Sequence, residues 1–291
     1  MTTLSKSSIK IPIGPFNFQI LVDTPSAYQD LTTLYQHYPR LADDSFIDFS
    51  VAVKPVSGLR KFYRPQAQFS LDDRQPFKPL PVSQAYPMLE WGMNWCIANY
   101  AHQYLMLHSA IIEKNGQAII LPAPQGSGKS TLCAAMTFNG WRLFSDEIAL
   151  IDMHDGLGYP CTRPINLKNQ SISILQNYAK QAVFSSVAHD THKGSVSLLK
   201  PQLDSVEKMH IPAPISHFVF PKYKANSKAQ LFPLNKLDAF SLLIGNSFNY
   251  HALGKAGFEI MAQTMTNAKC YMFEYSQFDE ANSVLTNLVE D

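Results

Sequence analysis

The sequence predicts a mixed α/β (α+β) protein, divided into a small β-rich N-terminal domain over residues 1–80 and a larger domain over residues 81–291. Its 291 residues are 46% apolar and 12% aromatic, which is enough to bury a sizeable core. Every second residue of the segment 16–22 is large and apolar, the period of a half-buried strand. Residues 118–136 combine an apolar strand, a glycine-containing loop and a helical segment.

In the N-terminal domain we expect strands at 16–22, 45–54 and 60–71 and one helix at 25–37. Pro65 interrupts the third strand. Because proline has no N–H to donate to a neighbouring strand, this strand is expected at the edge of a sheet. Residues 72–81 hold three prolines and four charged residues, the composition of a linker.

The larger domain is expected to begin with a helix at 83–103 and a strand at 105–112. The dipeptide Asn115-Gly116 predicts a hairpin turn after that strand. The remaining expected elements are, in order, a strand at 118–121, a helix ending near 139, strands at 141–144 and 147–152, a turn at 154–158, short strands such as 217–220 within 160–235, helices at 237–248 and 254–268, a strand at 269–275 and a helix at 278–289.

Charge and cysteine content exclude several classes of protein. Lys plus Arg number 24 and Asp plus Glu number 23, which argues against a nucleic-acid partner. The four cysteines are scattered without metal-ligand spacing and are expected to be reduced, as in the cytoplasm. The start of the sequence lacks a secretory signal, and no apolar run is long enough to span a membrane. The low charged fraction of 16% is compatible with apolar surface kept for a partner or a homo-oligomer.

The strongest motif is the segment 123–131, which reads Ala-Pro-Gln-Gly-Ser-Gly-Lys-Ser-Thr. It fits the phosphate-loop pattern G-x-x-x-x-G-K-[ST] except that Ala123 replaces the first glycine. Glycines allow backbone N–H groups to wrap an anion, and the following helix N-terminus adds donors. We expect Lys129 to contact the β- and γ-phosphates and Ser130 to offer its hydroxyl to Mg²⁺. A glycine turn with a surface lysine is the simpler alternative. The predicted cofactor-binding residues are Gln125, Gly126, Ser127, Gly128, Lys129, Ser130 and Thr131.

An acidic pair, Asp146-Glu147, follows the loop. Asp146 lies 17 residues after Lys129, room for one helix and one short strand, and is expected at the strand end beside the loop. Asp152 is a rival because it ends an apolar strand, but it leads into the turn at 154–158 and so belongs at the far end of a hairpin. A turn-capping role is the structural alternative for Asp146. Glu147 is the predicted metal ligand beside Ser130.

Several segments together resemble HPr kinase/phosphorylase, and more closely the HPr-kinase-related kinases of bacteria. They are Leu107-His108-Ser-Ala-Ile-Ile, the Asn115-Gly116 turn, the phosphate loop and Gly140-Trp-Arg-Leu-Phe-Ser-Asp146-Glu147. The resemblance covers residues 105–152 well and continues more weakly to the C-terminus. It fails over residues 1–80, the acidic pair is Asp-Glu instead of Asp-Asp, and Pro164-Ile-Asn-Leu replaces a glycine-rich segment. These departures argue against HPr itself as the substrate.

The resemblance implies a P-loop core with a fold like that of phosphoenolpyruvate carboxykinase, and ATP and Mg²⁺ as cofactors. It implies Asp146 as the base that accepts the proton of the attacking hydroxyl, with His108 beside the transferred phosphoryl group. Arg163 could clamp a phosphate bidentately, or be an ordinary surface arginine. Lys193 could contact the transition state from a flexible loop, or be a solvated lysine. The predicted catalytic residues are Asp146, His108, Lys129, Arg163 and Lys193, and the predicted metal ligands are Ser130 and Glu147.

The leading hypothesis is an ATP- and Mg²⁺-dependent kinase that phosphorylates a serine-like hydroxyl of a protein, peptide or small molecule. The second hypothesis is a nucleotide-binding NTPase or regulatory module that transfers phosphate to no acceptor. A small carboxykinase-like enzyme is disfavoured by the short chain, which lacks an evident ligand set for Mn²⁺ or oxaloacetate. Neither a nucleic acid nor a membrane is expected as a partner.

Overall fold

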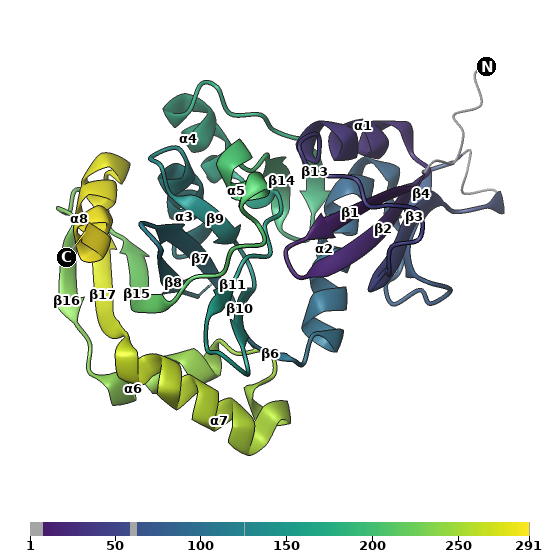
Figure 1. Ribbon diagram of the computed structural model, residues 1–291. Coiled ribbons are helices and arrows are strands. Elements are labelled where there is room, and N and C mark those ends of the chain that lie inside the picture. Colours follow the sequence, from purple (N-terminus) through teal and green to yellow (C-terminus); the bar gives the residue numbers. More distant parts are fainter. Residues whose placement is uncertain (1–7, 59–62, 125, 291) are drawn as a thin grey trace.

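The computed structural model describes residues 8–58, 63–124 and 126–290, and in these residues it contains eight α-helices and four β-sheets (Figure 1). The mixed α/β class predicted from the sequence is therefore confirmed. The N-terminal sheet and its helices lie at one end of the molecule, and the C-terminal strands and helices lie at the other (Figure 1).

The N-terminal sheet has the order β1-β2-β3-β4-β5. Its strands are β1 (Ile9–Ile13), β2 (Phe16–Val22), β3 (Phe49–Pro55), β4 (Gln66–Leu71) and β5 (Leu80–Pro81). Strand β2 pairs with β3 in parallel, and the connection between them contains helix α1 (Pro25–Leu34). The edge prediction is wrong, because β4 begins directly after Pro65 but lies between β3 and β5. The segment 72–81, predicted as a linker, contributes β5 to the sheet. The start of the strand predicted at 60–71 lies partly outside the described residues.

Helix α2 (Ala85–Tyr100) covers the N-terminal sheet and follows a 3₁₀ turn at Val82–Gln84. Its buried side chains Leu89, Met93 and Cys96 belong to the same hydrophobic cluster as Phe18 and Val51 of the sheet. The core of the N-terminal part thus continues past residue 80 into this helix, because a single sheet face needs a covering layer to exclude water.

The central sheet carries the phosphate-loop segment. Its order is β16-β17-β15-β8-β7-β9, with β16 (Gln230–Pro233), β17 (Lys269–Tyr275), β15 (Ile215–Tyr223), β8 (Gln117–Pro122), β7 (Ser109–Lys114) and β9 (Arg142–Ser145). Strands β8, β15 and β17 are parallel, while β7 is antiparallel to both β8 and β9. The carboxyl ends of β8, β9, β15 and β17 therefore meet at one edge, together with the start of β7. The predicted Asn115-Gly116 hairpin is confirmed, with both residues at positive φ.

The strand predicted at 105–112 is in fact two strands in two sheets. Strand β6 (Tyr104–Leu107) pairs with β10 (Ala149–Asp152) in a sheet of order β11-β10-β6, where β11 is Gly158–Tyr159. The chain changes sheets at His108, whose N–H donates to the carbonyl of Asn246 at 2.6 Å. The continuous apolar run hides this break, since both halves are buried.

Residues 160–235 hold more regular structure than their Pro- and Ser-rich sequence predicts. A third sheet has the order β12-β14-β13, formed by β12 (Ile165–Lys168), β14 (Gly194–Leu199) and β13 (Ala188–Thr191). Two helices of this region were not predicted, α4 (Gln170–Tyr178) and α5 (Leu203–Glu207).

The remaining helices lie where they were predicted, although the last two before the final strand differ in their bounds and the second of these is kinked at Gly254, where φ is +56°. They are α3 (Lys129–Thr137), α6 (Lys236–Gly245), α7 (Tyr250–Asn267) and α8 (Phe278–Glu290). Asn249, the residue before α7, fastens that helix to β6, because its side chain accepts from Met106 N at 2.9 Å and donates to Tyr104 O at 2.8 Å. Over the described part of the chain, the helices are too short or too polar for any of them to cross a bilayer.

Candidate functional site

The phosphate-loop segment connects the carboxyl end of β8 to the first turn of α3. Gly126 and Gly128 have φ angles of +82° and +88°, in the left-handed region that other residues rarely adopt. Gly128 also has little room: a Cβ added there would lie 2.9 Å from the hydroxyl oxygen of Tyr275, which donates a hydrogen bond to Gly128 O at 3.3 Å. The expected strand–loop–helix context is confirmed. Gln125, a predicted binding residue, lies outside the described residues.

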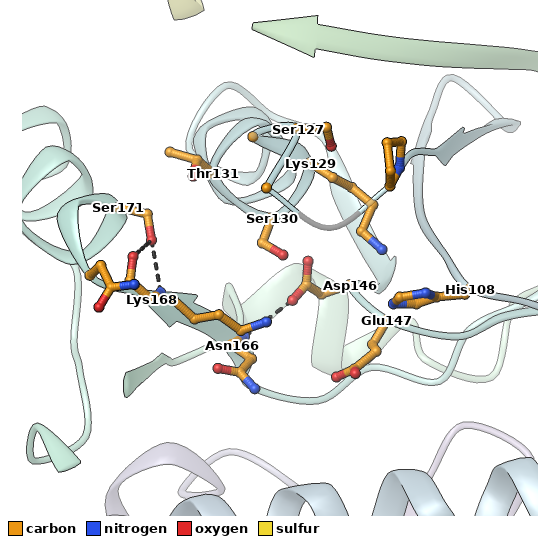
Figure 2. A pocket seen from close by; sticks show the side chains of 14 residues that line it. His108, Ser127, Lys129, Ser130, Thr131, Asp146, Glu147, Asn166, Lys168 and Ser171 are labelled. Atoms are coloured by element: carbon orange, nitrogen blue, oxygen red, sulfur yellow. Dashed lines mark hydrogen bonds between the residues drawn. The ribbon is translucent and has the colours of Figure 1, made fainter. Parts of the chain in front are cut away.

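Side chains from several elements converge on a pocket of about 290 Å³ at this edge of the central sheet. Figure 2 shows Lys129 and Ser130, from the start of α3, beside the carboxylate of Asp146, which follows β9. Glu147 and His108 lie at one end of the pocket and Ser171 at the other (Figure 2). They meet because β8 and β9 run in the same direction, while β7 begins at the same edge.

Asp146 is 8% exposed, and its two oxygens differ. Oδ2 accepts a hydrogen bond from the backbone N of Asn166 at 3.2 Å, whereas Oδ1 is buried and has no partner among the described residues. Burial raises the pKa of Asp146 and the Glu147 carboxylate adds to that rise, whereas the Lys129 ammonium and the nearby Ser130 hydroxyl oppose it. The bond to Asn166 joins separate segments, so Asp146 does not cap its own turn; that local role belongs to Ser145.

Burial also acts on Lys129 and His108, two of the basic groups of this pocket. Lys129 is 8% exposed, and burial lowers its pKa while the carboxylates of Asp146 and Glu147 raise it. Burial, followed by the charge of Lys129, lowers the pKa of His108 to about 4, so its imidazole is neutral at neutral pH. Its ring lies against Phe248, with 5.6 Å between the ring centroids.

Arg163 is buried next to this pocket and is absent from its lining. Its Nη1 donates to the backbone O of Glu90 at 3.2 Å and lies 3.4 Å from the Glu90 carboxylate, and its Nη2 donates to Asn94 Oδ1. Asn94 in turn donates to Glu147 Oε2 at 2.9 Å. Arg163 is thus not a surface arginine. It does not line the phosphate-loop pocket itself, but it lines a small adjoining cavity together with Asp146 and Glu147. Its role as a phosphate clamp stays a prediction.

Lys193 lies in the turn between β13 and β14, as the loop prediction expected. Its Nζ is 5.2 Å from the centroid of the Trp91 ring, and it lines a second pocket beside the first. Asp152, the rival acid, accepts from the backbone N of His154 at 2.7 Å in the predicted turn. It is absent from the phosphate-loop pocket.

Sequence reasoning missed five further residues of the pocket, of which Pro124 lies in the phosphate loop itself. Asn166 and Lys168 lie on β12, and their neighbours Ile165 and Leu167 are in the core. This alternation of apolar and polar residues is a signal for a strand with one polar face, which the proline-rich surroundings obscured. Asn169 and Ser171, at the start of α4, complete the wall opposite the loop.

The oxygen atoms of the pocket suit a magnesium ion that is also held by phosphates. Ser130 and Glu147 offer a hydroxyl and a carboxylate to the same pocket, and the unpartnered Oδ1 of Asp146 is a buried acceptor that a cation or the proton of a hydroxyl group satisfies. Within residues 8–58, 63–124 and 126–290, no group of three or more His, Cys, Asp and Glu side chains could hold a metal by itself. Mg²⁺ commonly takes only one or two carboxylates from a protein, so these residues fit it.

Comparison with known proteins identifies one family model. The model of the SynChlorMet cassette protein ScmC matches residues 88–165, about a quarter of the chain, from α2 through the phosphate loop to the start of β12. No curated protein matches the chain. The expected kinship with HPr kinase/phosphorylase is therefore wrong: the family model that matches is that of ScmC. The segments read as HPr-kinase features are short and local, and such motifs recur among unrelated families.

Proposed function

We propose that this protein is an ATP- and Mg²⁺-dependent kinase that transfers the γ-phosphoryl group of ATP to a hydroxyl group. One observation carries the proposal: a glycine loop at the start of a helix, a buried lysine and a buried carboxylate with an unpartnered oxygen line the same pocket. Removing the charged groups of a lysine and an aspartate from water is unfavourable in free energy. A bound triphosphate with its cation would offset this penalty.

The phosphate-binding part of the proposal rests on the loop. Gly126, Gly128 and the first turn of α3 offer backbone N–H groups to an anion, and Lys129 adds a positive charge. We therefore propose that the central sheet with α3 is a P-loop nucleotide-binding core. A phosphoenolpyruvate-carboxykinase-like arrangement of that core stays a prediction.

The transfer part of the proposal rests on Asp146. The oxygen of the acceptor hydroxyl forms a bond to the γ-phosphorus, the bond from the γ-phosphorus to the bridging oxygen breaks, and ADP leaves. Asp146 accepts the hydroxyl proton as that bond forms, a role for which a carboxylate with a raised pKa is suited. Lys129 and the loop N–H groups hold the phosphates in line, and neutral His108 closes the acceptor end of the pocket without adding charge.

Mg²⁺, when bound, would neutralise phosphate charge. Ser130 and Glu147 are the residues that would hold it, and Asn94 fixes the orientation of Glu147 through its hydrogen bond.

Two variants test this function. Lys129→Ala is expected to weaken ATP binding by about 10- to 100-fold, because it removes a charge-assisted contact. Asp146→Asn is expected to leave ATP binding within a few-fold and to slow transfer by about 10²- to 10⁴-fold, because it removes the base. Lys255→Ala and Asp204→Asn are matched controls at exposed positions. ATP affinity is measured by calorimetry, and transfer by labelled product formed in cell extract.

Tight ATP binding without transfer to any acceptor would refute the kinase and leave the nucleotide-binding regulatory module. Near-normal transfer by Asp146→Asn would show that another group accepts the proton.

A further inference from the structure

A second, larger pocket adjoins the phosphate-loop pocket. It encloses about 740 Å³, and Glu147 lines both pockets. Its walls come from α2, from the segment before β5, from the turn between β13 and β14, and from Phe248. A volume of this size matches the sites that bind drug-sized molecules, and it would stay mostly empty around a bare serine side chain.

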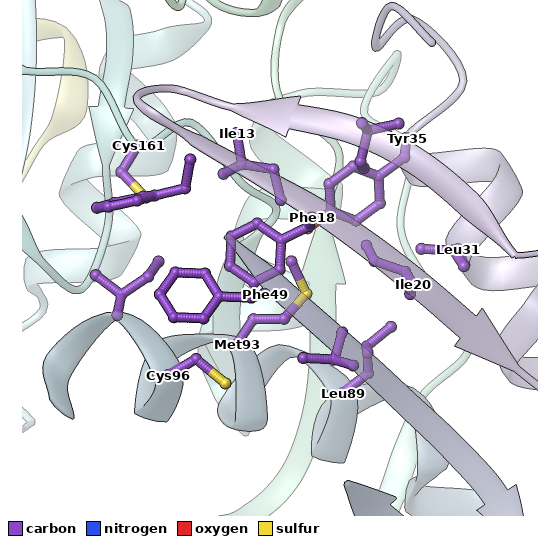
Figure 3. Packing of buried hydrophobic residues seen from close by; sticks show 14 of the residues in the cluster. Ile13, Phe18, Ile20, Leu31, Tyr35, Phe49, Leu89, Met93, Cys96 and Cys161 are labelled. Carbon is purple, nitrogen blue, oxygen red and sulfur yellow. The ribbon is translucent and has the colours of Figure 1, made fainter. Parts of the chain in front are cut away.

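Helix α2 supplies most of the apolar wall. Trp91, Asn94, Trp95 and Ala98 line the pocket, and their spacing of three, four and seven residues places them on one face of the helix. The opposite face carries Leu89, Met93 and Cys96, which point into the N-terminal core (Figure 3). The core thus holds this helix in place while two of the three tryptophans of the chain, Trp91 and Trp95, stay partly exposed on its other face, with Trp95 against Phe77. Leaving such surface open to water is unfavourable unless a ligand covers it.

A few polar groups lie among these aromatic walls. Asn94 donates to Glu147 Oε2 at 2.9 Å, which marks the boundary with the phosphate-loop pocket. The indole N–H of Trp91 is buried and has no acceptor among the residues described. Lys193 Nζ lies over the Trp91 ring at 5.2 Å from its centroid. An apolar pocket with a few convergent polar groups is the form that small-molecule sites take.

We propose that this second pocket binds the aromatic body of a small-molecule alcohol, with the hydroxyl placed beside Glu147 as the phosphate acceptor. The inference rests on the proposed kinase function and names the class of its acceptor. Kinase transfer would then join the alcohol oxygen to the γ-phosphorus, release ADP and pass the hydroxyl proton to Asp146. Phe248 supports this path, because it lines the second pocket and contacts His108 of the first.

The test uses 2-naphthalenemethanol, a primary alcohol on an aromatic body, as the probe. Its binding to the full chain is measured by calorimetry without nucleotide, and its phosphorylation with labelled ATP. Trp91→Ala and Trp95→Ala are each expected to weaken binding about tenfold, since each removes an aromatic wall. Ala98→Trp fills the pocket instead of opening it and is expected to cause a similar loss while ATP binding is retained. Phe46→Ala is the control, because Phe46 is 77% exposed and lies outside the pocket.

The proposal is overturned if the wild-type protein binds ATP but not the probe, or if Ala98→Trp binds the probe as well as the wild type does. It is also overturned if a serine–tryptophan peptide is phosphorylated and the free alcohol is not. Failure of the kinase looks different: the probe binds and responds to the variants as expected, but neither it nor any other acceptor receives phosphate. That result refutes the kinase and supports the aromatic pocket.

Discussion

Replacing Arg163 with methionine separates a structural role from a phosphate-binding one. The guanidinium and the Glu90 carboxylate are 7% and 3% exposed, and they form an ion pair at 3.4 Å. The same carboxylate accepts hydrogen bonds from Tyr35 at 2.9 Å and Tyr86 at 3.0 Å. Because Tyr35 follows α1 and Glu90 lies on α2, this buried cluster joins the N-terminal part to the segment before β12. Methionine keeps most of the side-chain volume and removes the charge.

The expected cost follows from what the variant leaves behind. Removing one partner of a buried ion pair costs about 3–5 kcal/mol, because the other charge stays desolvated. Glu90 keeps its two tyrosine donors, so we expect the lower end, about 3 kcal/mol. The double variant Glu90→Gln with Arg163→Met buries no charge and is expected to cost only about 1 kcal/mol.

Proton binding gives this prediction a second readout. Burial already raises the pKa of Glu90, and Arg163 is the largest influence that lowers it. Without Arg163 that pKa rises further. A carboxyl with a raised folded-state pKa contributes most stability below its unfolded value, near 4.3, and loses that contribution as the pH rises through the folded value. The cost of Arg163→Met should therefore be smaller at pH 5 than at pH 7.

Urea unfolding, followed by circular dichroism at both pH values, measures these free energies. Lys255→Ala is the control, because it breaks an exposed ion pair with Glu259 and is expected to cost under about 0.5 kcal/mol. If Arg163→Met left the free energy of unfolding unchanged but reduced ATP affinity about 10- to 100-fold, Arg163 would be a phosphate ligand and this reasoning would be refuted.

Three further predictions concern the phosphate-loop pocket. Gly128→Ala is expected to lower the free energy of unfolding in urea by about 1–3 kcal/mol and to weaken ATP binding, because φ is +88° and the added Cβ meets Tyr275. Gly245→Ala is the control, since a Cβ there meets no atom within 4 Å, and it should be near neutral. Equal effects of the two variants would contradict the prediction. His108 has its pKa lowered to about 4, so its contribution to stability is complete above pH 6.5 and is lost as the pH falls toward 4. That loss is about 1–2 kcal/mol after allowance for the partial exposure of His108. The prediction is disproved if the difference in free energy of unfolding between the wild type and His108→Gln does not change with pH. The transfer rate should rise with pH as Asp146 loses its proton, at a pH set by its raised pKa. If the pH–rate profile of the wild type shows no such rise, Asp146 is not the base.

The strand–loop–helix at 118–136 was predictable because its signals are local. Glycine adopts positive φ without help from distant residues, so this conformation of Gly126 and Gly128 could be expected from the sequence. The apolar run before the loop indicates a strand by its own pattern. The Asn115-Gly116 hairpin and the strand at 269–275 follow from equally local patterns. The position of Asp146 beside Lys129 also followed, since one helix and one strand leave few other places for it.

Other parts of the site depend on contacts between distant segments. The apolar run at 105–112 says nothing of the change of sheet at His108, which Asn246 and β10 impose from elsewhere in the chain. The sequence does not show that Arg163 is paired, because its partner Glu90 lies 73 residues away along the chain. Likewise, Asn166 and Lys168 face the pocket only because β12 pairs with β14.

The sequence by itself determined that this protein has a mixed α/β fold, a glycine loop able to wrap an anion, and a lysine and an aspartate placed to meet there. Those features depend on backbone conformations and periodicities set within a few residues. Only the tertiary structure decided which charges are paired in the interior, and that one face of α2 forms an aromatic pocket next to Glu147. Pairing and burial arise from segments tens of residues apart, and no local pattern records which segments will meet.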